Sequence, residues 1–244
     1  LSNDSEQIVL VDHKGNPVDS VKYFDDKPWP IHADGGGSSL ELRDPKSDNS
    51  VPESWSESSN SDQSEWVHYS YTMTAQVPTY TPTIRNFHEL RLGLLDSGEV
   101  LIDDVSVIED PGGANRELMQ NGTFDAGNAN YWRRIGTHKL SEVIDSEESP
   151  VLKIVASARM NYLNNLIETN LKSNGSWAPV KPGTDYQISF RAKWLKGTPQ
   201  LRFELYYNRL AKTVILKQPD KHGTPGEENS TRVVNSGPTF QNVN

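Results

Sequence analysis

The sequence predicts an all-β protein, a β-sandwich jelly roll with a second, smaller sandwich. Helical periodicity is nearly absent from the 244 residues, and runs of alternating apolar and polar residues take its place. Turn residues separate these runs, for example at 15–17 (GNP), 111–113 (PGG) and 182–183 (PG). Many short strands between frequent turns are typical of a β-sandwich.

Seven segments are expected to be strands. Two of them alternate most clearly, and each is predicted to place one apolar face in the core. Residues 161–171 fit a short helix and a strand equally well. The expected strands, in chain order, are 7–11, 38–42, 67–74, 90–95, 100–108, 186–194 and 201–207, and the last two carry the clear alternation.

Composition excludes several classes of protein. The absence of cysteine excludes a disulfide scaffold, a zinc–thiolate site, an iron–sulfur cluster and a cysteine nucleophile. No apolar run approaches the ~20 residues that a membrane-spanning helix needs. The net charge is −9, and residues 1–110 hold 21 acidic and 7 basic side chains. This acidity argues against nucleic acid as a partner. The sequence also has no run of Lys and Arg residues that would suggest binding to a membrane surface.

The first segment carries a series of short motifs in a fixed order. They are VDSVKY at 18–23, WP at 29–30, ADGGG at 33–37, SLEL at 39–42, DP at 44–45, DN at 48–49 and Trp55. This series resembles the lamin-tail domain, an immunoglobulin-like β-sandwich. The opening strand of that family, which would precede Ile8, is missing. We therefore expect the chain to be a fragment of a longer protein.

A closing motif of bacterial lamin-tail domains stands far from the others. It reads GTPGEEN at 223–229, about 160 residues after Trp55. Exposed loops tolerate inserted domains, so the spacing predicts one domain inside the other. The expected division is a discontinuous lamin-tail-like domain at 1–58 and 219–231, an inserted jelly roll at 63–217, and a linker at 232–244 toward a further domain.

The inserted part resembles the jelly-roll carbohydrate-binding modules of families 4 and 9, in the galactose-binding-like group. Their opening matches NGTFD at 121–125 with Trp132, and their middle matches PGTDYQISFRA at 182–192. Their ending matches WVHY at 66–69 and IDDVSV at 102–107, and thus precedes the opening. Two partial modules or one circularly permuted module would explain this order. We favour the permuted module, because the combined length suits one jelly roll.

A calcium site is predicted beside the closing strand. Asp103 and Asp104 interrupt an apolar run, and unpaired carboxylates are costly to bury. Calcium favours such oxygen ligands. The resemblance implies that Asp104 and Asp125 share a structural Ca²⁺, although Asp125 stands where the family usually has Glu. Alternatively, these acids cap turns or face water.

A sugar-binding row is predicted on two strands that are expected to pair. Aromatic planes suit the apolar faces of sugars, and Arg and Asn donors suit their hydroxyl groups. An ordinary solvated sheet face is the alternative. Trp177 is predicted to be an exposed loop aromatic, whereas Trp66, Trp132 and Trp194 are expected in the core. The candidate row is Arg191 and Lys193 on one strand, and Arg202, Tyr206 and Asn208 on the other.

Catalytic motifs are weak. The six histidines are scattered, and neither the HExxH nor the GxSxG pattern occurs. The sequence therefore predicts a non-catalytic module that anchors a larger secreted or cell-surface protein to polysaccharide, with covalently linked neighbouring domains and no membrane insertion. A structural spacer or protein-interaction module is one alternative. A jelly-roll polysaccharide lyase or hydrolase is the other.

Overall fold

A computed structural model describes residues 4–33, 38–58, 64–77, 86–160, 165–206 and 209–219. The chain divides into two compact units, of which the second spans Gln63–Gln218. Apart from three 3₁₀ turns, the described secondary structure consists of β-strands. No described helix is long and apolar enough to cross a membrane. The predicted all-β class is therefore confirmed.

The first unit contains two antiparallel pairs of strands. Strands β1 (Ser5–Val11) and β2 (Pro17–Phe24) form a hairpin, and β3 (Leu40–Leu42) pairs with β4 (Trp55–Glu57). Side chains from the predicted lamin-tail motifs contact one another here. The ring of Trp29 lies 6.0 Å from that of Trp55, which donates its indole N–H to the Asn49 carbonyl at 2.9 Å. The motif at 34–37 and the closing segment at 220–231 lie outside the described residues.

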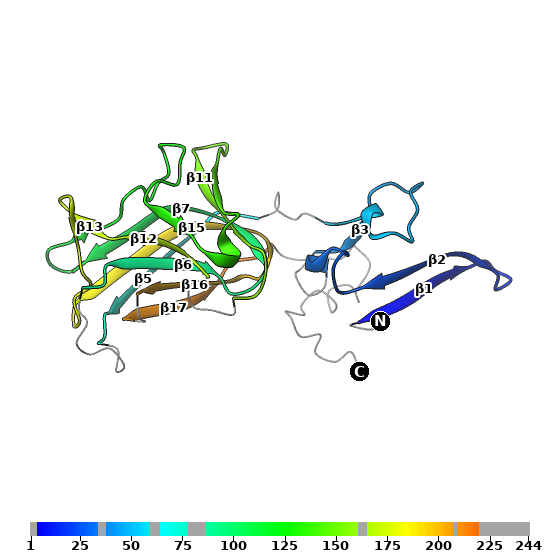
Figure 1. The fold of residues 1–244 in the computed structure, drawn as a ribbon, viewed down its shortest axis with the longest axis horizontal. Coiled ribbons are helices and arrows are strands. Elements are labelled where there is room, and N and C mark those ends of the chain that lie inside the picture. The colour runs from blue at the N-terminus through cyan, green and yellow to red at the C-terminus, as the bar shows by residue number, and fades with distance from the viewer. Residues whose placement is uncertain are drawn as a thin grey trace. The chain divides into compact units, whose positions relative to one another are not determined.

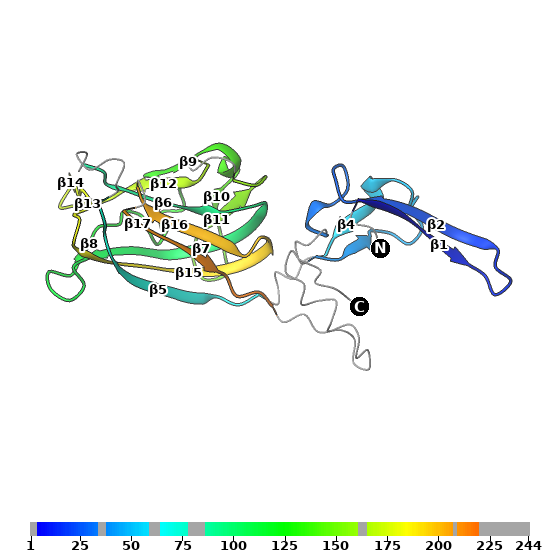
Figure 2. The same cartoon turned by 90° about the horizontal axis from the view of Figure 1, so that it is seen from below.

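The second unit is a sandwich of two antiparallel sheets (Figures 1 and 2). Sheets pack in this way because alternate side chains of each strand enter one shared core. The first sheet has the order β10 (Glu142–Ile144), β11 (Val151–Ala156), β7 (Gly98–Glu109), β15 (Asp185–Gly197) and β5 (Val67–Thr74), and β8 (Arg116–Glu117) also pairs with β7. The second has the order β17 (Leu210–Ile215), β16 (Gln200–Leu205), β6 (Glu89–Leu94), β12 (Ile167–Asn170) and β9 (Trp132–Arg134).

The core confirms the predicted alternation. The apolar positions of β15 are buried, and those of β16 are buried opposite them in the facing sheet. Trp132 and Trp194 are also buried, as predicted, whereas Trp66 is only half-buried. The buried alternating positions are Tyr186, Ile188, Phe190, Ala192 and Trp194 on β15, and Leu201, Phe203 and Leu205 on β16.

Six strands of the two sheets, β8 to β12 and β17, were not predicted as strands, and three of them show why. β11 carries a nearly continuous apolar run with several positions buried on both faces, which hides the alternation. β17 has only a short alternating pattern. The undecided segment 161–171 contains β12 from Ile167, and its first residues, 161–164, lie outside the described ranges.

The segments that resemble a module's opening and ending lie side by side. The short strand β8 pairs with the end of β7, and the Val105 N–H donates to the Gly122 carbonyl at 2.9 Å. A Cβ at Gly122 would lie 2.0 Å from the Val105 carbonyl oxygen, so only glycine permits this approach. Both segments thus belong to one sandwich. The permutation and the domain insertion themselves stay predictions.

Candidate functional site

The structure divides the predicted sugar-binding row between the two sheets. β15 pairs with β5 and β7, whereas β16 pairs with β6 and β17, so the expected β15–β16 pairing is wrong. The chain crosses from one sheet to the other between β15 and β16, so the apolar faces of these two strands enter the core from opposite sides. Arg191 and Lys193 therefore lie on one outer face, and Arg202 lies on the other. Asn208 lies outside the described residues.

Arg191 is the centre of an ion-pair cluster. Its guanidinium lies 2.8 Å from both Asp103 and Asp104 and 3.3 Å from Glu148, and it stands over the Trp66 ring at 5.2 Å. The hydrogen bond to Asp103 is the main reason that the pKa of Arg191 is raised. These contacts occupy the guanidinium and hold β7 to β15. The contacts favour a structural role for Arg191 over sugar binding.

Each of the three predicted calcium ligands has a protein partner in the structure, and Asp104 pairs with Arg191. Asp103 is 2% exposed, pairs with Arg191 and also accepts the Asp104 N–H at 2.8 Å. Asp125 accepts the Thr123 hydroxyl at 2.7 Å. Across the described ranges, no group of three His, Cys, Asp or Glu side chains is placed to hold a metal. The cost of burying Asp103, which motivated the prediction, is offset by arginine. Calcium binding stays an untested prediction.

An alternating row of charges crosses the outer face of the second sheet. Arg91 is 3% exposed and lies 3.1 Å from Glu204 and 3.4 Å from Glu168. Glu168 also pairs with Arg133, and Glu204 accepts a hydrogen bond from Arg202 at 2.9 Å. Register places these residues opposite one another on β9, β12, β6 and β16. The arginines and glutamates of this row therefore have one another as partners, and their opposite charges neutralise.

Tyr206 lies at the end of this row, just after β16. Its ring lies 5.0 Å from the Arg91 guanidinium carbon and meets the Phe87 ring edge-on at 4.9 Å. The ring is half-buried. Tyr206 thus packs within the sheet face that carries the row, whereas Arg191 and Lys193 lie on β15 in the other sheet.

A tight hairpin presents the exposed tryptophan. Strands β13 (Lys172–Ser173) and β14 (Ser176–Trp177) are joined by Asn174 and Gly175, which both have positive φ, at 49° and 77°. Two such residues make the type I′ turn that favours Asn-Gly and matches the twist of a hairpin. The register places Lys172 directly opposite Trp177. As predicted, Trp177 is exposed, at 53%.

Four side chains meet at this hairpin, and we call them the Lys172 cluster: Lys172, Trp177, Tyr131 and His88. The Lys172 ammonium lies 4.5 Å from the Trp177 ring centre and 5.9 Å from that of Tyr131. The His88 ring lies 4.7 Å from the indole. An ammonium over an aromatic face is attracted by the ring's electrons. The cluster thus combines a cation with two exposed rings, since Tyr131 is 60% exposed.

The loop before β9 holds Tyr131 in a strained conformation. Its φ is 74°, which is unusual for a bulky residue and costs on the order of 1–3 kcal/mol. The Asn121 amide donates to the carbonyls of Asn128 and Asn130 at 2.9 and 3.2 Å, and the Trp132 indole donates to the Asn121 carbonyl. These hydrogen bonds stabilise the loop and offset the strain at Tyr131. They present the Tyr131 ring to solvent in a fixed position, as a preformed binding surface requires.

Sequence reasoning found Trp177 and missed the other members of the cluster. The Asn-Gly pair at 174–175 predicts a two-residue hairpin turn, and that turn places residue 172 opposite residue 177. Lys172 could thus have been found from local signals. Tyr131 and His88 reach the cluster from distant parts of the chain, and no sequence pattern links them.

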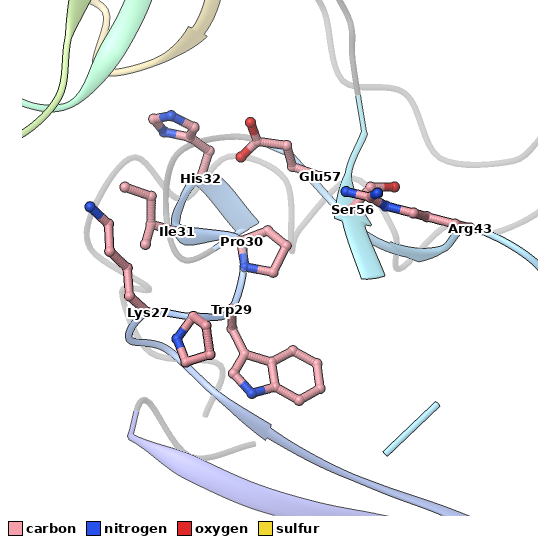
Figure 3. A pocket seen from close by; sticks show the side chains of 9 residues that line it. Lys27, Trp29, Pro30, Ile31, His32, Arg43, Ser56 and Glu57 are labelled. Atoms are coloured by element: carbon pink, nitrogen blue, oxygen red, sulfur yellow. The ribbon is translucent and has the colours of Figure 1, made fainter. Parts of the chain in front are cut away.

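The first unit has a hollow of about 520 Å³ beside Trp29 (Figure 3). The segment Lys27–His32 forms one side, and Arg43, Ser56 and Glu57 form the other. Trp29 is largely covered by its contact with Trp55, so the hollow offers little aromatic surface to a ligand.

The largest pKa shifts belong to buried contacts inside the sandwich. Burial lowers the pKa of His138 to about 4 and raises that of Tyr186 to about 12. Tyr186 donates to Glu109 at 3.3 Å; burial raises the pKa of Glu109, but Lys181 and Arg116 outweigh burial and lower it. Both His138 and Tyr186 are inaccessible to solvent. These shifts therefore report internal packing and ion pairs, and they do not mark an acid–base site open to substrate.

No protein-family model, curated protein or solved structure matches this chain. The β-sandwich class rests on the structure alone. The resemblances to lamin-tail domains and carbohydrate-binding modules stay predictions.

Proposed function

We propose that this protein is a non-catalytic carbohydrate-binding module, with the Lys172 cluster as its sugar-binding surface. The observation that carries the proposal is the joint exposure of Trp177 and Tyr131 around one ammonium group. Sugar rings offer apolar C–H faces to aromatic side chains and hydroxyl groups to polar ones. Backbone hydrogen bonds hold the loop before β9 and the hairpin that carry the two rings, which lowers the entropic cost of binding.

The wider context belongs to the same proposal. The module would anchor a larger secreted or cell-surface protein to polysaccharide, through neighbouring domains of one chain. A structural spacer and a polysaccharide lyase or hydrolase are the alternatives. The spacer predicts no binding at the cluster, and the enzyme predicts new reducing or unsaturated ends after incubation with polysaccharide.

Binding by the full chain, residues 1–244, tests the proposal. A glycan array and pull-downs with insoluble polysaccharides are expected to give saturable binding. Trp177→Ala removes the most exposed indole and is expected to weaken binding about tenfold or more, because loss of a central aromatic anchor costs at least about 1.4 kcal/mol. Equal binding by the variant and the unmodified chain would exclude the cluster.

A matched control separates the cluster from general surface effects. Ile215 is 61% exposed and lies on β17, at the opposite edge of the same sheet from β9. Ile215→Ala also removes exposed apolar surface and is expected to leave binding unchanged. Arg191→Ala tests the predicted row on β15, and binding lost only in this variant while its circular dichroism stays that of the unmodified chain would move the sugar site to that face.

Calcium is tested in the same samples. Asp104 and Asp125 were predicted to share a structural ion, so thermal unfolding is compared in Ca²⁺ and in chelator. A higher unfolding temperature in Ca²⁺, abolished by Asp125→Ala, would establish the ion. An unchanged temperature would leave Arg191 as the only cationic partner of Asp103 and Asp104 among the described residues.

A further inference from the structure

Lys172 differs from three lysines of the sandwich that form ion pairs with acidic side chains. Lys153, Lys181 and Lys217 lie 2.6–2.8 Å from carboxylate oxygens. In the described part of the chain, no carboxylate lies within ion-pair distance of the Lys172 ammonium. This group instead lies beside the aromatic rings of Trp177 and Tyr131. Among the described residues, Lys172 therefore has no acidic partner of its own at a surface that presents aromatic rings; the carboxylate beside the cluster is that of Glu89, 4.0 Å from the His88 ring.

The backbone at Lys172 is held by hydrogen bonds, and the two aromatic rings lie beside its ammonium group. The Lys172 N–H donates to the Leu118 carbonyl at 2.9 Å, and the Leu171 N–H donates to the His88 carbonyl at 2.6 Å. The type I′ turn then sets Lys172 across from Trp177. A charge held in one place contributes to specificity, because a ligand must place its own charge to match.

We infer that the Lys172 cluster binds an acidic saccharide, meaning a sugar unit that carries a carboxylate or a sulfate. The anionic group would pair with the Lys172 ammonium, and the apolar face of the same or the next sugar ring would lie on Tyr131 or Trp177. Charge-assisted hydrogen bonds are about twice as strong as neutral ones. This inference rests on the proposed function and adds the class of glycan.

The charge distribution of the chain is compatible with a polyanion bound at the Lys172 cluster. The acidic excess lies in residues 1–110, whereas residues 111–244 hold 17 basic and 12 acidic side chains. The second unit, residues 63–218, contains the cluster and holds 17 acidic and 17 basic side chains, so its formal net charge is zero. An acidic polysaccharide would therefore meet less repulsion here than a net charge of −9 suggests.

The test uses a pair of ligands that differ only in charge. Polygalacturonate and its carboxyl-reduced form are titrated into residues 1–244 by calorimetry, and dextran sulfate, which carries sulfate groups and no carboxylate, forms a third arm. The acidic ligands are expected to bind at least tenfold more tightly than the reduced one. The sulfated arm distinguishes sulfate from carboxylate as the preferred anion.

Three variants assign the preference to Lys172. Lys172→Met keeps an apolar stem over the rings and is expected to lose at least tenfold in affinity for the acidic ligand. Lys172→Arg keeps the charge and is expected to stay within about threefold of the unmodified chain. Lys139→Met removes an exposed lysine outside the cluster and is expected to have no effect. Circular dichroism and unfolding temperature confirm that each variant folds.

The outcomes separate the two levels of the proposal. Equal binding of the acidic and reduced ligands, with Trp177→Ala still weakening both, overturns the acidic preference and leaves carbohydrate binding in place. Acidic binding that Lys172→Met does not change also overturns the inference, because the selective charge then lies elsewhere. Failure of every glycan to bind overturns both the proposed function and its acidic preference.

Discussion

His138 is expected to make the sandwich sensitive to mild acid. Its ring is fully buried, and its Nε2 accepts the Leu94 N–H at 3.0 Å. A protonated ring would carry a hydrogen on both nitrogens and could not accept this bond. Burial is the main cause that lowers the pKa of His138 to about 4, and a contact with the Asn165 backbone opposes burial in part.

The direction and size of the effect follow from proton linkage. The pKa is about 4 in the folded chain and about 6.5 in the unfolded chain, so the unfolded chain takes up the proton first as the pH falls. The neutral ring's contribution is complete above about pH 6.5 and is lost progressively toward pH 4. Between pH 7.5 and pH 5 the second unit is expected to lose about 2 kcal/mol of unfolding free energy.

Urea unfolding at these two pH values measures this loss, followed by amide NMR signals of residues in the second unit. His138→Gln keeps a carbonyl acceptor for the Leu94 N–H but has no proton to gain, so its stability is expected to change little over this window. A direct titration of the imidazole gives an independent measurement. A ring that titrates near pH 6.5, or an equal loss of stability in His138→Gln, would refute the reasoning.

Three further predictions concern contacts away from the Lys172 cluster. Gly122→Ala is expected to destabilise the second unit by about 2 kcal/mol in urea unfolding, because its Cβ would overlap the Val105 carbonyl oxygen; an unchanged midpoint would contradict this close approach. Arg191→Met leaves Asp103 buried without its cation and is expected to cost about 3 kcal/mol, most of which Asp103→Asn in the double variant should restore. Leu10→Lys is expected to lower self-association of the full chain in sedimentation experiments, because β1 exposes a continuous apolar run; identical sedimentation at high concentration would exclude that strand as the cause.

The sequence alone determined the β class and much of the core. Alternation along 186–194 and 201–207 identified which side chains are buried, because the side chains of a strand point to opposite faces with a period of two. The Asn-Gly pair at 174–175 is enough to predict a hairpin turn. The position of Trp177 in the same loop predicts its exposure, which the structure shows. All of these are local properties of a few neighbouring residues.

Only the tertiary structure decided which strands share a sheet. Alternation states that a face is apolar, but it does not state which strand pairs with which, because two strands can meet one core from opposite sheets. For this reason Arg191 and Arg202 separated, and Arg191 instead neutralises Asp103 and Asp104. The same long-range packing brings Tyr131 to Lys172 across 40 intervening positions in the sequence. Contacts of this kind depend on how distant segments fold together, and no local pattern in the sequence encodes them.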